Sequence, residues 1–326
     1  MGSVNISVEL RKIAEDTGDE GIRDMAEKIA DFEERRVRVD RYTPDQVLPV
    51  PEEWAADFFR MCDRGTETAR RSHVTICGMA RNIGNILPVT ISRLEKIGSN
   101  FSDYAIVIVE NDSEDNTKEI LHDLAKKNPR KVTCITQDLG WEHLHGFEAS
   151  RVERYAVLRN QYADVVKQDY RHTDFVLVVD LDCWGGWSGQ GIASGIGWLK
   201  KIKSAACMAS TSLFQGLQIG TDVHFGHYDT WALRVHGWRE GLLPWKTAWL
   251  PPPGSPPVKV YSAFGAAAIY RPEAFLECRY ESVDGDIEHA GLHRQMIEKG
   301  WEIYLNPAQR SLMQWVPDAE GKDGND

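Results

Sequence analysis

The chain has 326 residues, 42% of them hydrophobic, and carries a formal net charge of −11 at pH 7. This length suits one large α/β domain, alone or with an extension. The acidic balance argues against a nucleic-acid-binding protein and against a basic membrane-binding patch, so we expect no nucleic-acid partner.

Residues 1–72 are highly charged, and their apolar positions recur at helical spacing. Pro51 can open a further helix, because a proline is tolerated where a helix begins. We therefore expect an N-terminal helical extension over 1–72 that packs on the main domain. The main domain is expected over 73–318, followed by a disordered tail over 319–326.

From His73 onward, short apolar runs alternate with helical patterns. This alternation predicts a Rossmann-like α/β fold, with a mostly parallel central sheet and helices on both faces. Ligands of such sheets bind beyond the carboxyl ends of the strands. The predicted strands cover residues 74–80, 104–112, 131–136 and 174–182. The predicted helices cover residues 86–98, 116–128 and 151–168.

Two carboxylates follow the buried strand Val176–Val179 at positions i and i+2, namely Asp180 and Asp182. Like charges repel at the end of a buried strand, and their desolvation costs several kcal/mol unless a positive charge lies between them. A divalent cation, Mn²⁺ or Mg²⁺, would resolve the conflict. The alternative is that Asp182 only opens a turn.

Polar residues also follow the first two strands, and in a parallel sheet these ends lie beside that of Asp180. Arg81 is expected to approach a phosphate, and Glu110 or Asn111 to bind a base or ribose. The alternative for the segment after the second strand is a helix N-cap at Ser113. We also expect Arg159, from the helix over 151–168, to reach the phosphate or ribose rather than lie on the surface.

These strand ends resemble those of GT-A-fold, nucleotide-sugar-dependent glycosyltransferases. Segments further along the chain resemble successive motifs of the fungal (cryptococcal) capsule α-1,3-mannosyltransferase family, and the resemblance covers residues 74–307. The matching segments are ENDSEDNT (110–117), VLRNQ (157–161), AAC (205–207), YDTWALR (228–234) and VYSAFGA (260–266).

The resemblance implies transfer of a sugar from a nucleotide-diphosphate sugar to a glycan hydroxyl, in polysaccharide or glycoconjugate synthesis. GDP-mannose is the favoured donor, a UDP-sugar is possible, and retention of configuration is slightly favoured. Asp180 and Asp182 would hold the metal, with Asp180 also near the donor. The implied donor-binding residues are Arg81, Glu110, Asn111, Asp112 and Arg159. The implied sugar and acceptor residues are Tyr228, Asp229, Trp231 and Arg234.

The segment CWGGWSGQG (183–191) departs from the family pattern, which leaves the donor preference open. It nearly forms a dinucleotide-binding fingerprint, but it follows the wrong strand end and lacks the third glycine.

An acidic segment over 281–289 precedes a predicted helix over 290–300. Glu288 or Asp286 can orient the acceptor hydroxyl or accept its proton. His289 and His293 share one helix face with metal-ligand spacing, and His289 is expected to complete the metal site. The alternative is an acidic first helical turn favoured by the helix dipole.

The loop over 243–257 is rich in proline and tryptophan. Trp245 and Trp249 can stack on sugar rings of the acceptor. Equally, the prolines can serve only to stiffen a surface loop.

Six scattered cysteines without a C-x-x-C pair indicate reduced thiols. No apolar run is long enough to span a bilayer, and the first residues lack a signal core. We expect a cytoplasmic protein, possibly peripheral to a membrane-bound glycan assembly system. Two other functions remain open: a nucleotidyltransferase that makes nucleotide sugars, and a non-enzymatic carbohydrate-binding protein.

Overall fold

The computed structural model describes residues 6–34, 43–142, 144, 148–219, 222–238, 240–241 and 243–313, and the predicted tail over 319–326 lies outside these ranges. Within them, ten strands form one sheet, in which the order β3-β2-β1-β4-β9-β6-β10-β5 is extended by β7 beside β6 and β8 beside β10. The strands are β1 (His73–Ala80), β2 (Asp103–Asn111), β3 (Val132–Gln137), β4 (Phe175–Asp180), β5 (Gly186–Trp187), β6 (Ala205–Ile219), β7 (Asp222–His227), β8 (Val258–Val260), β9 (Ala267–Tyr270) and β10 (Glu302–Leu312).

Parallel pairing joins β3, β2, β1 and β4, and also β6 and β10, whereas β9 runs antiparallel between β4 and β6. The predicted mostly parallel α/β fold is therefore confirmed. The helices of the main domain are α5 (Leu87–Gly98), α6 (Thr117–Lys127), α7 (Ala149–Asp169), α8 (Gly189–Lys201), α9 (Pro244–Ala248), α10 (Pro272–Phe275) and α11 (Glu288–Glu298).

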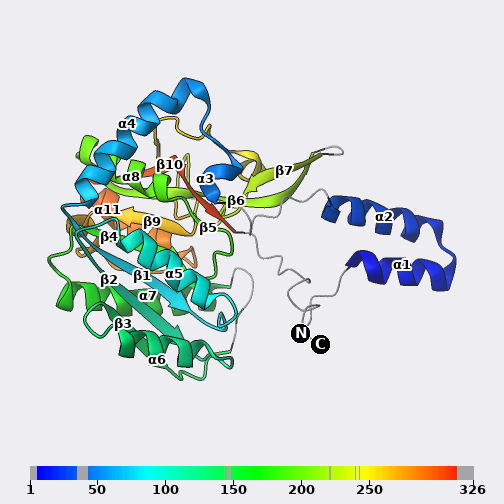
Figure 1. The fold of residues 1–326 in the computed structure, drawn as a ribbon, viewed down its shortest axis with the longest axis horizontal. Helices are drawn as coiled ribbons and strands as arrows, with labels where there is room; N and C mark the ends of the chain where they lie inside the picture. Colours follow the sequence, from blue (N-terminus) through cyan, green and yellow to red (C-terminus); the bar gives the residue numbers. More distant parts are fainter. Residues whose placement is uncertain are drawn as a thin grey trace.

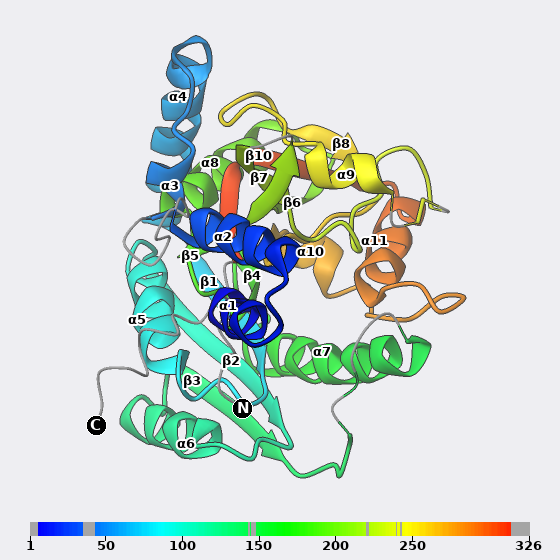
Figure 2. The ribbon, with the colours of Figure 1, turned by 90° about the vertical axis from the view of Figure 1, so that its right-hand side faces the viewer.

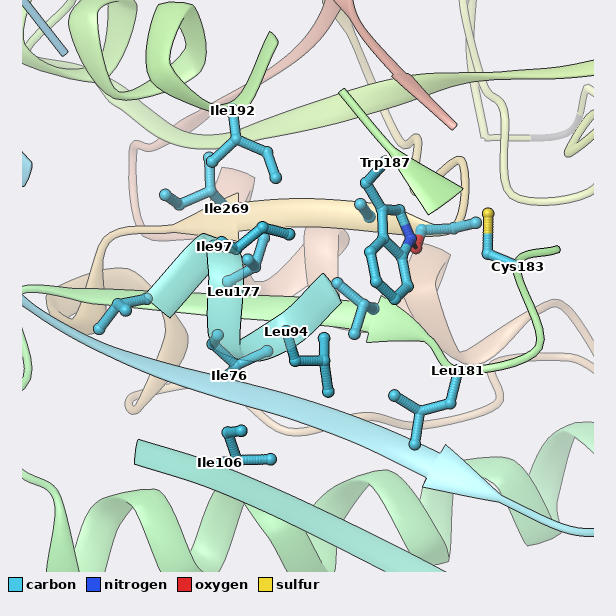
Figure 3. Close-up of a cluster of buried hydrophobic side chains, with 14 of the residues drawn as sticks. Ile76, Leu94, Ile97, Ile106, Leu177, Leu181, Cys183, Trp187, Ile192 and Ile269 are labelled. Atoms are coloured by element: carbon cyan, nitrogen blue, oxygen red, sulfur yellow. Dashed lines mark hydrogen bonds between the residues drawn. The ribbon is translucent and has the colours of Figure 1, made fainter. Parts of the chain in front are cut away.

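The sheet has a hydrophobic core on each face, because successive strand residues point to opposite sides. Ile76 packs in one core with residues of α5, α6 and α8, and Cys77 packs in the other with residues of α7 and α11. Figure 2 shows α5 and α6 on one side of β1–β3 and α7 on the other. Figure 3 shows the first core, in which the indole of Trp187 lies among aliphatic side chains. The Trp187 Nε1 donates a hydrogen bond to the Ala266 carbonyl at 3.0 Å.

The N-terminal helices are α1 (Ile6–Thr17), α2 (Glu20–Glu34), α3 (Pro44–Val47) and α4 (Glu52–Ala69). Pro51 is the N-cap of α4, as the sequence predicts for the start of this helix. Contacts join α1 to α2, α3 to α8 and β10, and α4 to α8 along much of its length. Figure 1 shows α1 and α2 as a pair and α4 against α8. Thus α4 packs on the main domain, as expected for the extension; the boundary at residue 72 stays a prediction.

Two further features of the sequence, its cysteines and its apolar segments, can be compared with the structure. All six cysteines are free. No helix among the described residues is long and apolar enough to cross a bilayer.

Candidate functional site

A cavity of about 480 Å³ lies at the carboxyl ends of β1, β2 and β4. Its walls also come from α7, the loop after β7 and the first turn of α11, which are far apart in sequence. Among its lining residues are the following that the sequence singles out: Arg81, Asn111, Arg159, Asp180, Asp182, Tyr228, Asp229, Trp231, Glu288 and His289.

The register of the sheet explains why the strand ends meet. Met79 pairs with Asp180 across β1 and β4, and Ala80 pairs with Glu110 across β1 and β2. The three ends therefore lie side by side at one edge, as expected for parallel neighbours.

Asp180 is the last residue of β4, and Asp182 follows it in the turn. Desolvation raises the pKa of Asp180 to about 7; Arg159 opposes this, and the carboxylates of Asp182 and Asp229 add to the increase. Desolvation also raises the pKa of Asp182. Asp182 is exposed and the Asp180 side chain is 31% exposed, so both can reach a ligand in the cavity. A cation between these carboxylates would relieve their repulsion.

His289 lies in the first turn of α11 with 1% of its surface exposed. Its ring stacks on Phe264, with ring centroids 3.9 Å apart and planes 19° apart. Within the part of the chain that the structure describes, neither ring nitrogen has a hydrogen-bond partner. Burial, followed by the positive charge of Arg159, lowers the pKa of His289 well below its ordinary value, so the imidazole is neutral, as metal ligation requires.

His293 lies on the same face of α11 as His289, as the spacing predicts, and their ring centroids are 6.2 Å apart. Its Nδ1 is hydrogen-bonded to the Ser262 hydroxyl at 2.9 Å and its Nε2 to the Tyr270 hydroxyl at 3.0 Å. Both nitrogens are therefore used inside the core. His293 therefore has no free nitrogen for a metal, and His289, the histidine predicted as a ligand, is the only one of the two whose ring nitrogens lack a hydrogen bond within the described residues.

Arg159 joins two of the cavity's acidic groups. The guanidinium has only 4% exposure, and its Nε donates to Glu288 Oε1 at 2.8 Å while its Nη2 donates to Asp180 Oδ1 at 3.4 Å. It also lies over the Phe264 ring, 5.0 Å from the centroid. Burial raises the pKa of Glu288, and Arg159 opposes the shift.

Three further arginines, Arg81, Arg151 and Arg154, line the cavity together with Arg159. The guanidinium of Arg151 lies 4.9 Å from the ring centroid of Tyr155 and 5.7 Å from that of Trp231. The four arginines are set against five acidic residues of the same lining, Glu142, Asp180, Asp182, Asp229 and Glu288. An anionic ligand would therefore need the charge of a bound cation in addition to that of the arginines.

Six of the predicted site residues do not line this cavity. Glu110 is fully buried, and its Oε1 accepts a hydrogen bond from the Ser113 amide at 2.8 Å. Arg234 is ion-paired with Asp286 and also donates to the carbonyls of Trp231 and Leu233. These contacts hold loops together. The other predicted residues outside the lining are Asp112, Trp245 and Trp249.

Trp245 and Trp249 flank Lys246 in α9 and its C-cap, with their ring centroids 6.1 Å apart. Trp245 is 37% exposed. Lys246 between them is fully buried, and its Nζ donates to the Leu233 and Gly241 carbonyls at 2.6 and 2.9 Å. The proline-rich loop is therefore anchored beside the 233–241 segment.

Among the cavity residues that were not predicted from the sequence are Trp141, Arg154 and Phe264. Arg154 lies one turn before Leu158 on α7 and belongs to the arginine-rich stretch that pointed to Arg159. Phe264 lies in the segment VYSAFGA (260–266), which resembles a family motif but was given no site role. The loop after β3 carries no periodic pattern that would have indicated Trp141.

No family model and no curated protein matches the chain. Among solved structures, it is similar to GalNAc-T7 with UDP, GalNAc and Mn²⁺, with a TM-score of 0.50 and 15% identity. This match covers 87% of the chain and 49% of GalNAc-T7, so the chain spans about half of that protein's length.

Weaker similarities were found to two other structures. The mannosyltransferase PcManGT from Pyrobaculum calidifontis, in complex with GDP-Man and Mn²⁺, gives a TM-score of 0.43 at 14% identity, over 82% of this chain and 68% of that one. S. aureus TarS 1-349 gives 0.43 at 12% identity, over 73% and 59%. The strand order and the likeness to GalNAc-T7 together show that the chain has a GT-A-like fold.

Proposed function

We propose that the protein is a metal-dependent glycosyltransferase, which transfers a sugar from a nucleotide-diphosphate sugar to a hydroxyl of a glycan. The observation that carries this proposal is the position of Asp180 and Asp182. They end β4 in a cavity that also holds four arginines and the neutral, buried His289. The GT-A-like fold supports it, because ligands of open α/β sheets bind at this edge.

Mn²⁺ or Mg²⁺ would be held by Asp180 and Asp182. His289, predicted from the sequence as a further ligand, lines the same cavity but does not form a three-residue metal site with them in the described part of the chain. Neither ring nitrogen of His289 has a hydrogen-bond partner among the described residues, which fits this role, although Nε2 lies 3.6 Å from Glu288 Oε1. Among those residues, no group of three histidine, cysteine or acidic side chains forms a metal site by itself. This is compatible with hard cations such as Mg²⁺, which use one or two carboxylates plus substrate phosphates.

The bound cation would neutralise charge on the leaving nucleoside diphosphate. Arg81 and Arg159 would add positive charge beside the phosphates, and Asn111 would bind the nucleoside. The sequence resemblance favours GDP-mannose as donor. Because the similar GalNAc-T7 structure contains UDP, a UDP-sugar is the other candidate for the donor.

The sugar and acceptor would lie between the loop after β7 and α11. Tyr228 and Trp231 would provide aromatic surface for a sugar ring. Asp229 would shape this loop rather than bind sugar, because its Oδ1 accepts from the Ala232 amide and its Oδ2 from the Gly265 amide. Trp245 and Trp249 lie outside the cavity, so any acceptor contact there would involve a longer glycan.

The proton of the acceptor hydroxyl has two routes. In a retaining reaction, the hydroxyl oxygen bonds to the anomeric carbon, the bond from that carbon to the diphosphate oxygen breaks, and the departing phosphate takes the proton. In an inverting reaction, a carboxylate takes it. Glu288 is the better candidate for that carboxylate, because it lines the cavity, whereas Asp286 is paired with Arg234 outside it. Retention remains slightly favoured, by the resemblance alone.

By the same resemblance, the product would belong to polysaccharide or glycoconjugate synthesis. We place the reaction in the cytoplasm; a location at the surface of a membrane that carries the growing glycan stays open.

Thermal unfolding with GDP, UDP, CMP and their sugars, each with and without Mn²⁺, tests the proposal. A ligand at a hundredfold excess over its Kd stabilises the native state by about 2.7 kcal/mol. We expect a Mn²⁺-dependent increase in Tm with one nucleotide, and its loss in Asp182→Asn. The exposed Asp123 on α6 supplies the matched control, Asp123→Asn.

No shift with any nucleotide would contradict the proposal and favour a non-enzymatic carbohydrate-binding protein. Release of pyrophosphate from a nucleoside triphosphate and a sugar 1-phosphate would instead identify a nucleotidyltransferase. Transfer from the stabilising nucleotide sugar to a glycan would support the glycosyltransferase.

A further inference from the structure

Trp141, which follows β3, lines the cavity on the side opposite to the acidic pair. In the sheet order, β3 and β2 lie on one side of β1, and β4 with Asp180 lies on the other. The cavity therefore has an acidic end near β4 and an aromatic end near β2 and β3, with Arg81 of the β1 end between them.

The loop that carries Trp141 is held in place by Asp112. Asp112 Oδ1 accepts hydrogen bonds from the Leu139 and Gly140 amides, both at 2.7 Å, and its Oδ2 accepts from the Trp141 amide at 3.3 Å. Asp112 itself has a left-handed backbone, with φ of 52°. Strained backbone of this kind is maintained where the surrounding contacts require it.

Two arginines fix the tryptophan further. Arg81 Nη2 donates to the Trp141 carbonyl at 2.7 Å, and Arg154 Nη1 donates to the Glu142 carbonyl at 2.9 Å. The Arg154 guanidinium lies 5.2 Å from the Trp141 ring centroid. Arg154 therefore lies over one face of the Trp141 indole, and both residues line the wall of the cavity.

We propose that Trp141, together with Arg154, is the stacking surface for the nucleobase of the donor, and that Asp112 positions it. This inference rests on the proposed function, because a metal at Asp180 and Asp182 would place the diphosphate at the acidic end. The nucleoside then extends away from the metal, past Arg81, toward Trp141. Arg81 Nε is buried and has no hydrogen-bond partner among the described residues, so a ribose or phosphate oxygen along this path would satisfy it.

Planar bases stack on tryptophan and on guanidinium planes with little regard to base identity. The surface would therefore supply affinity, whereas base selection would come from polar groups such as the Asn111 amide. Asp112, predicted as a direct donor ligand, is assigned here to positioning, since four hydrogen bonds from the protein already occupy its carboxylate.

The test is calorimetric titration of the full chain, in Mn²⁺, with GDP, UDP, CDP and ADP, and with inorganic pyrophosphate as the base-free probe. Trp141→Ala is expected to weaken binding of the preferred nucleoside diphosphate about tenfold or more, while the affinity for pyrophosphate changes less than about twofold. Trp141→Phe, which keeps an aromatic ring, should recover most of the loss. Phe59→Ala removes an aromatic side chain that is 51% exposed on α4 and is the matched control.

Asp112→Asn gives a second variant that retains the aromatic ring but loses its positioning. It should reproduce part of the Trp141→Ala effect on the nucleotide, again without an effect on pyrophosphate. If wild type binds a nucleoside diphosphate and Trp141→Ala binds it equally well, the stacking assignment is wrong while the proposed function stands. An equal loss for nucleotide and pyrophosphate would also overturn it. If wild type binds none of the four nucleotides, the proposed function and this inference both fail.

Discussion

Arg159 on α7 and Glu288 on α11 form a buried ion pair, with Arg159 Nε 2.8 Å from Glu288 Oε1. Their side chains are 5% and 1% exposed. The same guanidinium contacts Asp180 Oδ1 at 3.4 Å, so one arginine links the end of β4 to the start of α11. The sequence predicts a ligand contact for Arg159 and a catalytic role for Glu288. The structure adds that the guanidinium and the carboxylate position each other through this ion pair.

Replacing Arg159 by leucine should lower the free energy of unfolding by about 3–5 kcal/mol, because it leaves Glu288 buried without its partner. Equilibrium urea unfolding at pH 8 measures this loss. The double variant Arg159→Leu/Glu288→Gln should be more stable than the single one, since the unpaired charge is gone. The exposed pair Arg279–Asp164 provides the control: Arg279→Leu should cost at most about 1 kcal/mol. Equal losses in Arg159→Leu and Arg279→Leu would contradict the burial argument.

Glu288→Gln should reduce turnover at least about a hundredfold, within the range that general acid–base groups contribute, with donor binding intact. The measurement is transfer at saturating donor, together with the donor Kd. Asp284→Asn is the control in the same acidic segment: Asp284 is exposed, and asparagine tolerates its φ of 55°. Turnover near the wild-type value in Glu288→Gln would remove Glu288 from the chemistry and favour proton transfer to the leaving phosphate.

The sequence predicts the sheet and the acidic end of the cavity well, because both follow from local patterns. Apolar runs identify β1 to β4, and parallel neighbours place their polar ends together. Contacts between distant loops carry no such pattern. Arg234 and Asp286 are 52 residues apart and pair only in the folded chain. The sequence therefore could not show whether these two residues bind a ligand or hold two loops together.

The glycine-rich segment 183–191 shows a different limit of prediction from sequence. Its composition suggests a nucleotide loop, but Gly191 lies where α8 approaches β10, and a Cβ there would contact the Ala308 carbonyl oxygen and the Gln309 Cα. The glycine permits close packing of a helix on a strand. Composition alone does not distinguish this from phosphate binding, because both require backbone to approach closely.

Acid should destabilise the protein through His227, which is buried at the end of β7. Burial lowers the pKa of His227 to about 4, from an ordinary value near 6.5. Between pH 4 and pH 6.5, His227 is protonated in the unfolded state and neutral in the folded state. The contribution of neutral His227 to the free energy of unfolding is therefore complete above pH 6.5. It falls by about 1.4 kcal/mol per pH unit as the pH is lowered toward 4.

Urea unfolding of wild type and His227→Gln at several pH values between 4 and 7 isolates this contribution. The variant should lose stability less steeply on acidification, with the difference reaching about 3 kcal/mol near pH 4. The exposed His224 on the same strand is the control, and His224→Gln should follow the wild-type slope. Parallel curves for wild type and His227→Gln would show that folding does not lower the pKa of His227.

The close contact between α4 and α8 should make two glycines intolerant of a methyl group. A Cβ on Gly65 would overlap the Ala193 carbonyl oxygen, and one on Gly197 would overlap the Met61 carbonyl oxygen. Both obstacles are backbone atoms, so the helices must move apart. Gly65→Ala should therefore cost about 1–3 kcal/mol, despite alanine's higher helix propensity.

Gly189→Ala is the matched control at the start of α8, where an added Cβ would meet no heavy atom of the described chain within 4 Å. It should leave the free energy of unfolding unchanged or slightly higher, as alanine restricts the unfolded chain. The double variant Gly65→Ala/Gly197→Ala should cost less than the sum of the single ones, because the first substitution already separates the helices. If Gly65→Ala matches Gly189→Ala in urea unfolding, α4 does not belong to the cooperative unit of the main domain. A clear loss would place α4 within that unit, and the N-terminal boundary of the folding unit would then lie before residue 52 rather than at 73.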